Sequence, residues 1–91
     1  RVNAVLPGAI DTDMLQALAV RSAGSVDAGY EALSDRIVMG RVARPREMAD
    51  VICYLASEQA SYVTGIAMLA DGGLAAGTPG VKQTAKPKGA S

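Results

Sequence analysis

Three neighbouring side chains near the start of the chain, Asp11, Thr12 and Asp13, are of types that take part in chemistry. A pair of carboxylates at this spacing could serve in general acid–base catalysis. The same residues are also typical of a helix start, where side-chain oxygens accept backbone N–H bonds and negative charge is favoured. We therefore interpret Asp11 and Asp13 as helix-start residues and not as a catalytic pair. Thr12 could both cap a helix and bind a phosphate, because helix amino ends hold anions.

The composition excludes several other kinds of site. The chain has no His, which removes the commonest metal ligand and the commonest general base. Its single Cys, Cys53, cannot form an intrachain disulfide or a Cys-rich metal site. We accordingly predict no metal site, and we expect Cys53 to be a small packed thiol without a chemical task.

Charge and hydropathy narrow the range of partners. Nine basic and nine acidic residues give a net charge of zero, and all the lysines lie in the last ten residues, at Lys82, Lys86 and Lys88. That basic stretch contains no aromatic residue that could stack on bases, so we expect no nucleic acid partner. No apolar run approaches the ~20 residues of a membrane span, and no signal peptide is recognisable. We expect a soluble cytoplasmic protein that does not bind membranes.

The elements that must position these residues begin with a short strand. Residues 2–6 form an apolar run ended by a Pro-Gly pair, which indicates a strand buried on both faces, as in a parallel sheet. We expect its one polar side chain, Asn3, to hydrogen-bond to neighbouring backbone. The spacing of apolar residues after the Pro-Gly pair predicts helices at 12–22 and 27–38, separated by a break that contains Gly and Ser.

A third helix, over residues 45–57, has the clearest pattern in the chain. Pro45 suits the first helical position, and Glu47 places negative charge in the first turn. An apolar stripe follows at helical spacing, at Met48, Val51, Ile52, Leu55 and Ala56. Residues 66–70 then form a second apolar strand, and this order of elements is what a right-handed parallel crossover requires. The Asp-Gly-Gly at 71–73 lacks the following helix of a phosphate-binding loop, so we interpret it as a strand end that packs closely against another segment.

Several short motifs occur together in a fixed order along residues 1–74. They are the Pro-Gly turn with Thr12 four positions beyond Gly8, Gly40-Arg41 leading to Pro45-Arg46-Glu47, Leu55-Ala56-Ser57, Val63-Thr64-Gly65 and Asp71-Gly72-Gly73. In this order they resemble the carboxy-terminal segment of the short-chain dehydrogenase/reductases. The resemblance implies an α/β fold: the C-terminal part of a Rossmann-type doubly wound parallel sheet, with two strands plus intervening helices, incomplete as a stand-alone fold. Residues 75–91 are rich in Ala, Gly, Pro and Lys, and we expect them to be a disordered tail.

The resemblance also implies roles for residues near the start of the chain. In that family the Pro-Gly turn lies against the nicotinamide half of NAD or NADP. Pro7 and Gly8 suit this task, because Pro fixes a backbone torsion and Gly lets the main chain approach a planar ring. The backbone of Ile10 would hydrogen-bond the nicotinamide carboxamide, and the hydroxyl of Thr12 would bond the carboxamide or the pyrophosphate. These four residues are the predicted cofactor-binding residues.

Two further expectations come from the same resemblance. Met14, Leu15 and Leu18 match the part of the family that closes over the substrate, and their apolar character suggests a partly apolar alcohol or carbonyl substrate. Residues 45–57 and 62–73 match elements that pair across a two-fold axis. We therefore expect a homodimer or a homotetramer.

The catalytic residues of the family are not found in this chain. The glycine-rich cofactor turn, the Asn-Ala-Gly strand end, the catalytic Ser and the Tyr-x-x-x-Lys pair all belong upstream of such a segment. None of Tyr30, Tyr54 and Tyr62 is followed by Lys four positions later, so none has a Lys placed to lower its pKa for proton transfer. We predict no catalytic residue here and expect these 91 residues alone to be inactive.

Two functions remain open on the sequence alone. Because the chain begins directly in the first motif without a Met, we expect the C-terminal fragment of an NAD(P)-dependent oxidoreductase that interconverts an alcohol and a carbonyl. It would supply the nicotinamide-side wall, the substrate lid and a subunit interface. The alternative is a catalytically inactive truncated chain that acts only as an interaction module. The two differ in whether the upstream reading frame encodes the Ser and the Tyr-x-x-x-Lys pair.

Overall fold

The computed structural model describes residues 1–77. The tail predicted for 75–91 lies outside the described residues from residue 78 onward, and its first residues belong to a short 3-10 helix, Leu74–Ala76. The other elements are β1 (Ala4–Pro7), α1 (Asp13–Ala23), α2 (Val26–Ser34), α3 (Pro45–Ala56), a 3-10 turn (Glu58–Ala60) and β2 (Ala67–Ala70). The three predicted helices and two predicted strands are present, with shifted ends. None of the described helices is long and apolar enough to cross a membrane.

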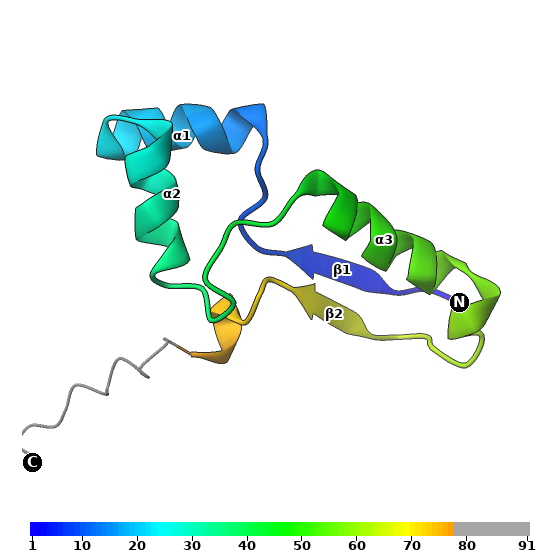
Figure 1. Ribbon diagram of the computed structural model, residues 1–91. Coiled ribbons are helices and arrows are strands. Elements are labelled where there is room, and N and C mark those ends of the chain that lie inside the picture. Colours follow the sequence, from blue (N-terminus) through cyan, green and yellow to red (C-terminus); the bar gives the residue numbers. More distant parts are fainter. Residues whose placement is uncertain (78–91) are drawn as a thin grey trace, which may run out of the picture.

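β1 and β2 are neighbouring parallel strands. They pair in register from Ala4 with Ala67 to Pro7 with Ala70. α3 lies across one face of this two-stranded sheet, while α1 and α2 project beyond the carboxyl end of β1 (Figure 1). This arrangement confirms the predicted α/β class, in which parallel strands are joined through helices.

Only one face of the sheet is covered within residues 1–77. Val5 and Met68, which pair across the strands, are half-buried, and Val5 lies beside Leu55 of α3. Leu6 and Leu69 point to the other side, and 40% and 57% of their surfaces are exposed. Within residues 1–77 the strand is therefore covered on one face, because no described segment covers the side of Leu6 and Leu69.

Side-chain hydrogen bonds tie together the amino ends of the two strands. Asn3 donates from Nδ2 to the carbonyl of Val63 (3.1 Å) and accepts at Oδ1 from the N–H of Ile66 (3.2 Å). The hydroxyl oxygen of Thr64 accepts a bond from the N–H of Val2 (3.0 Å). The predicted role of Asn3, bonding to neighbouring backbone, is confirmed.

α1 and α2 pack against each other as a helical hairpin. Thr12 and Ser25 cap the amino ends of the two helices with their side-chain oxygens, and Gly24 ends α1 in the left-handed conformation, with φ 91°. Gly29 of α2 faces Ala19 of α1 so closely that a Cβ on Gly29 would overlap the side chain of Ala19. These small residues allow the two helix backbones to approach.

α2 ends at Ser34, well before the predicted end at residue 38. Residues 35–40 form turns instead. The cause is a contact with a distant segment, since the N–H of Met39 donates to the carbonyl of Gly72 (2.9 Å) and Ile37, only 2% exposed, lies against the same residue. This pairing draws the chain toward the end of β2 and out of the helix.

α3 follows its predicted pattern. It begins at Pro45 and ends at Ala56, one residue before the predicted end. Leu55 is buried, whereas Ile52 is 54% exposed. Cys53 is also exposed, so the expectation of a packed thiol is wrong. Cys53 lies next to the apolar stripe of α3, on a part of the helix surface that no described segment covers.

Candidate functional site

The predicted cofactor-binding residues follow directly from the end of β1. Gly8 comes after the last strand residue, and its N–H donates to the carbonyl of Ala70, the last residue of β2 (3.3 Å). In open α/β sheets, ligands bind in the crevice outside the carboxyl ends of the strands. The segment from Pro7 to Thr12 is therefore at the edge of the sheet where a ligand is expected.

Gly8 leaves no room for a side chain. A Cβ at this position would lie 2.7 Å from the Cβ of Asp71 and 2.9 Å from its Cα. The carboxylate of Asp71 accepts bonds from the N–H groups of Ala75 (2.9 Å) and Gly73 (3.0 Å), and these bonds lower the pKa of Asp71. Because Gly8 has no side chain, the ends of the two strands can pack closely against each other. This packing requires Gly at this position whether or not a ligand binds there.

The predicted strand end at residues 71–73 is confirmed as a closely packed turn. Gly72 and Gly73 have φ values of 64° and 92°, which favour glycine. A Cβ on Gly72 would lie 2.9 Å from Cγ2 of Ile37, and a Cβ on Gly73 would lie 2.7 Å from the Cβ of Val38. The loop after α2 therefore packs directly on this turn.

Ile10 forms a single parallel bridge with Ala43. Both bonds of the bridge belong to Ala43, whose N–H donates to the carbonyl of Ala9 (3.0 Å) and whose carbonyl accepts from the N–H of Asp11 (2.8 Å). In such a ladder the N–H and C=O of the intervening residue point away from the partner segment. Within residues 1–77 these two groups of Ile10 make no hydrogen bond, so they can bind a ligand on the side opposite Ala43.

Thr12 is exposed at the start of α1. Its Oγ1 accepts from the N–H of Leu15 (3.2 Å), and its carbonyl accepts from the N–H of Gln16 (2.9 Å). The capping role is confirmed, and the hydroxyl can still donate its proton to another group. Ile10 and Thr12 thus present two donors and an acceptor along one short segment.

Asp11 joins the start of α1 to α2. Its Oδ1 accepts from the hydroxyl of Tyr30 (2.7 Å) and from Nε2 of Gln16 (3.1 Å). The bond from Gln16, followed by that from Tyr30, lowers the pKa of Asp11. Desolvation, followed by the bond to Asp11, raises the pKa of Tyr30 to about 12. A tyrosine that transfers protons near neutral pH needs a lowered pKa, so this pair is suited to a structural role.

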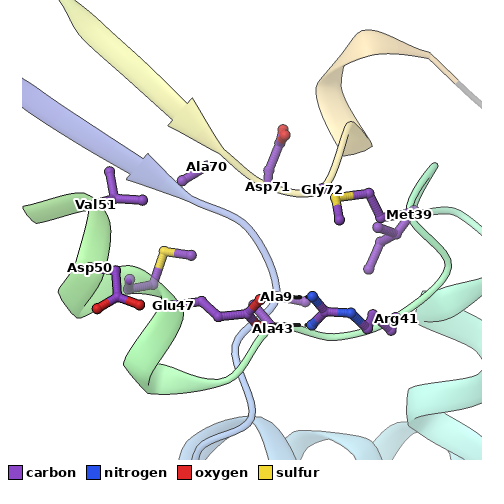
Figure 2. Close-up of a pocket in the computed structure, with 12 residues that line it drawn as sticks. Ala9, Met39, Arg41, Ala43, Glu47, Asp50, Val51, Ala70, Asp71 and Gly72 are labelled. Carbon is purple, nitrogen blue, oxygen red and sulfur yellow. Dashed lines mark hydrogen bonds and ion pairs between the residues drawn. The ribbon is translucent and has the colours of Figure 1, made fainter. Parts of the chain in front are cut away.

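A pocket of about 370 Å³ opens at the same end of the sheet, between the start of α3 and the loop after α2 (Figure 2). Its lining is largely apolar, and its charged members are Arg41, Glu47, Asp50 and Asp71. Ala9 and Ala43, which bond to each other beside Ile10, also line it. None of the four predicted cofactor-binding residues does, so the Pro7–Thr12 segment contributes only Ala9 to the pocket.

The ion pair in this pocket was not predicted from the sequence pattern, which assigned Glu47 only to the first turn of a helix. The guanidinium of Arg41 donates two bonds to the Glu47 carboxylate, at 2.8 and 2.7 Å. Glu47 also accepts from the N–H of Arg44 (2.8 Å). The bond from Arg41, followed by that from Arg44, lowers the pKa of Glu47 to about 2. The pair fixes the loop before α3 to the helix, and the Gly-Arg motif was the available signal for it.

Replacing Glu47 with Gln should lower the stability of the full-length protein in a pH-dependent way. The pKa of Glu47 falls from 4.5 to about 2 on folding, so its ionised form stabilises the fold above pH 4.5, and this contribution is lost as the pH falls toward 2. Solvent screening keeps the effect small, because 37% of the side chain is exposed. Melting temperatures of the wild type and Glu47→Gln should therefore differ near neutral pH and converge on acidification.

Asp50→Asn is the matched control for this prediction. It removes a carboxylate from the same helix, but that carboxylate lies 3.8 Å from Arg46 in a highly exposed pair. It should lower the melting temperature little at any pH. If the melting temperature of Glu47→Gln stayed below that of the wild type by the same amount from neutral to acidic pH, the ionised carboxylate of Glu47 would not be the source of the stability difference.

The predicted lid residues lie on α1 and differ in their surroundings. Met14 is 82% exposed and Leu18 is 50% exposed, while Leu15 is half-buried. Leu15 and Leu18 line a groove of about 280 Å³ between α1 and α2. None of the three lines the pocket at the strand ends. The hairpin therefore carries its own apolar surface, separate from that pocket.

Known proteins match almost the whole described part of the chain. Residues 1–75 match the family model described as enoyl-(acyl carrier protein) reductase. The uncharacterized oxidoreductase YmfI of Bacillus subtilis is 45% identical over 73 residues, which make up 80% of this chain and 27% of that protein. The 3-oxoacyl-(acyl-carrier-protein) reductase FabG of Thermotoga maritima is 45% identical over 74 residues, which make up 81% of this chain and 27% of that reductase.

A solved structure has the same arrangement of elements. The aldohexose dehydrogenase of Thermoplasma acidophilum matches with a TM-score of 0.82 at 32% identity, over 97% of this chain and 34% of that one. The chain thus spans about a third or less of the length of the relatives it matches. The family model matches residues 1–75, a range that contains the Pro-Gly turn, the helical hairpin, α3 and β2. The chain belongs to the short-chain dehydrogenase/reductase family.

Proposed function

We propose that this chain supplies the nicotinamide-side wall, the substrate lid and a subunit interface of an NAD(P)-dependent oxidoreductase that interconverts an alcohol and a carbonyl. Its relatives include oxidoreductases, among them the FabG reductase. The observation that carries the proposal is the pair of unbonded backbone groups of Ile10, next to the hydroxyl of Thr12 at the carboxyl end of β1.

The backbone of Ile10 fits the cofactor part of this proposal. A carboxamide has an acceptor oxygen and an NH₂ donor, which complement the N–H and C=O of one extended residue. Ile10 is half-buried, and its backbone N–H and C=O make no hydrogen bond within residues 1–77. A nicotinamide bound there would supply the hydride for carbonyl reduction, while Ile10 would hold its ring in a fixed orientation.

Pro7, Gly8 and Thr12 have supporting roles in the same proposal. Pro7 ends β1, and Gly8 packs against Asp71, so the start of the segment is held firmly to the sheet. Thr12 would donate its hydroxyl proton to the carboxamide or the pyrophosphate while it caps α1. The amino end of α1 would then also favour the negative charge of the pyrophosphate.

The hairpin of α1 and α2 is the proposed lid. It projects beyond the carboxyl end of β1, next to the Pro7–Thr12 segment, which is the proposed cofactor segment (Figure 1). Met14 and Leu18 offer exposed apolar surface on its first helix. Such a surface suits a partly apolar alcohol or carbonyl substrate, because closure over it would remove apolar area from water.

Exposed apolar side chains support the proposed subunit interface. Ile52 and Tyr54 on α3 are 54% and 41% exposed, and Tyr62 is also exposed. They fall in residues 45–57 and 62–73, which we propose pair across a two-fold axis in a homodimer or homotetramer. The same surface would serve an inactive interaction module, but the unbonded backbone groups of Ile10 would have no task there. We therefore favour the enzyme.

Replacing Thr12 with Ala in the full-length enzyme that contains this segment tests the proposal. We expect the KM for the nucleotide to rise about ten-fold, because a hydrogen bond to a charged group contributes about 1.5–3 kcal/mol and ten-fold corresponds to about 1.4 kcal/mol. Steady-state kinetics at varied nucleotide concentration measures this change. An unchanged KM would show that Thr12 has no part in binding the cofactor.

Two further variants separate binding from helix capping. Thr12→Ser keeps the hydroxyl and should retain both binding and stability. Thr12→Asp keeps a cap but cannot donate a proton and adds negative charge, so it should unfold near the wild-type temperature and yet bind the nucleotide as poorly as Thr12→Ala. If Thr12→Asp bound the nucleotide normally, the hydroxyl would act only on the helix.

A further inference from the structure

Tyr30 connects the hairpin to the proposed cofactor segment. It lies on α2, and its hydroxyl donates to Oδ1 of Asp11 at 2.7 Å. The same oxygen accepts from Gln16 on α1 at 3.1 Å. Asp11 itself stands between Ile10 and Thr12, the two residues proposed to bind the cofactor. One carboxylate therefore joins this segment to both helices of the hairpin.

Few other contacts fix the hairpin within residues 1–77. α1 and α2 pack on each other, and neither packs extensively on α3 or on the sheet (Figure 1). Backbone bonds anchor its two ends, through the bridge between Ile10 and Ala43 and the bond from Met39 to Gly72. In this part of the chain, the bond from Tyr30 is the side-chain hydrogen bond that joins α2 to the segment before α1. Without it, the hairpin would be free to turn about its anchored ends.

We propose that Tyr30 is a positioning residue for cofactor binding: through its bond to Asp11 it holds the hairpin and the Ile10–Thr12 segment in the binding-competent arrangement. This inference rests on the proposed function and extends it to a residue outside the proposed cofactor site. A bond to a carboxylate is a strong hydrogen bond, and Tyr30 is half-buried. When the free enzyme occupies the competent arrangement less often, the apparent dissociation constant rises by the inverse of that fraction, while bound enzyme reacts as before.

Tyr30→Phe tests the inference because it removes the hydroxyl and keeps the packed ring. In the full-length enzyme we expect the KM for the nucleotide to rise about three- to ten-fold, while kcat changes by less than about two-fold. Asp11→Ala removes the other partner, so the double variant should have the KM of the worse single variant and not the product of the two effects. A lower kcat at unchanged KM, or multiplied effects in the double variant, would overturn the inference.

Hydrogen exchange provides a readout that does not depend on turnover. In the unliganded full-length enzyme, the amides of α1 should exchange about three- to ten-fold faster in Tyr30→Phe than in the wild type. Glu31→Gln is the matched control, since that side chain is exposed on the same helix, α2, and it should leave the exchange of α1 unchanged. If Tyr30→Phe bound the nucleotide as the wild type does, and the α1 amides exchanged at the same rate in both proteins, the role of Tyr30 would be overturned. The proposed function would not be affected by that result. An unmodified enzyme that bound no NAD(P) would overturn the proposed function and the cofactor part of this inference with it.

Discussion

The isolated 91-residue chain should show no cooperative thermal unfolding transition and no NAD(P)-dependent turnover. In its described part four apolar side chains are buried, at Ala19, Ile37, Leu55 and Ala60. Leu6 and Leu69 are exposed on the open face of the sheet, and Met14 is exposed on α1. Ordering one residue costs about 1–2 kcal/mol of backbone entropy, which so little buried apolar surface cannot offset.

The two strands add a second difficulty for the isolated chain. β1 and β2 form the whole described sheet, so each strand has one edge without a partner. Two strands with one bare face do not make an independently stable sheet, and unpaired edges invite association with other chains. We therefore expect aggregates or an uncooperative, expanded monomer.

Circular dichroism melts and sedimentation velocity on the isolated chain would measure this outcome. The control is a chimera in which residues 1–74 replace the matching segment of the Thermotoga maritima FabG reductase, which is 45% identical to this chain over 74 residues. The chimera should melt in one sharp transition and retain reductase turnover, because the host supplies the part of the protein that this chain does not span. A sharp melting transition in a soluble monomer of the isolated chain would contradict the prediction.

The starts of the elements could be predicted because they depend on local chemistry. Thr12 and Pro45 mark the beginnings of α1 and α3 through a side-chain cap and a fixed backbone torsion. Asn3 interrupts an apolar strand, and a buried polar group requires partners, which it finds in Val63 and Ile66. The parallel pairing followed from two apolar runs separated by helices. In each case the deciding interaction lies within a few residues or follows from a general rule.

The remaining features depend on partners far away in the sequence. α2 stops early because the N–H of Met39 bonds to the carbonyl of Gly72, and no residue within the helix predicts that bond. The bond from Tyr30 to Asp11 likewise needs the hairpin to fold back on the segment before it. Cys53 and Ile52 illustrate the same limit, since a stripe on a helix shows which side is apolar but not how wide the covering surface is. The family resemblance supplied part of this long-range information, because relatives share a common arrangement of segments that lie far apart in the sequence.

Gly8→Ala in the full-length enzyme should lower kcat/KM by about ten- to hundred-fold, since a misplacement of about 1 Å near the reacting groups can cost that much. The new Cβ would lie 2.7 Å from the Cβ of Asp71 and 2.9 Å from its Cα, so it must displace backbone and not a flexible side-chain end. Overpacking of this kind destabilises a fold by about 1–3 kcal/mol. The displacement falls where Gly8 bonds to Ala70, and it would carry the Ile10–Thr12 segment away from the sheet.

Gly65→Ala is the control that separates misplacement at the site from a general loss of stability. Gly65 has a φ of 76°, so Ala there costs about 1–2 kcal/mol of backbone strain, yet its Cβ would meet no atom of the described residues within 4 Å. Its N–H bonds to Val2, at the opposite end of the strands from Gly8. Both variants should therefore melt at lower temperature, but only Gly8→Ala should lose nucleotide affinity and turnover when measured well below its melting temperature. Equal kinetic losses in the two variants would mean that activity follows overall stability, and the close approach of Gly8 to Asp71 would then have no special part in placing the cofactor segment.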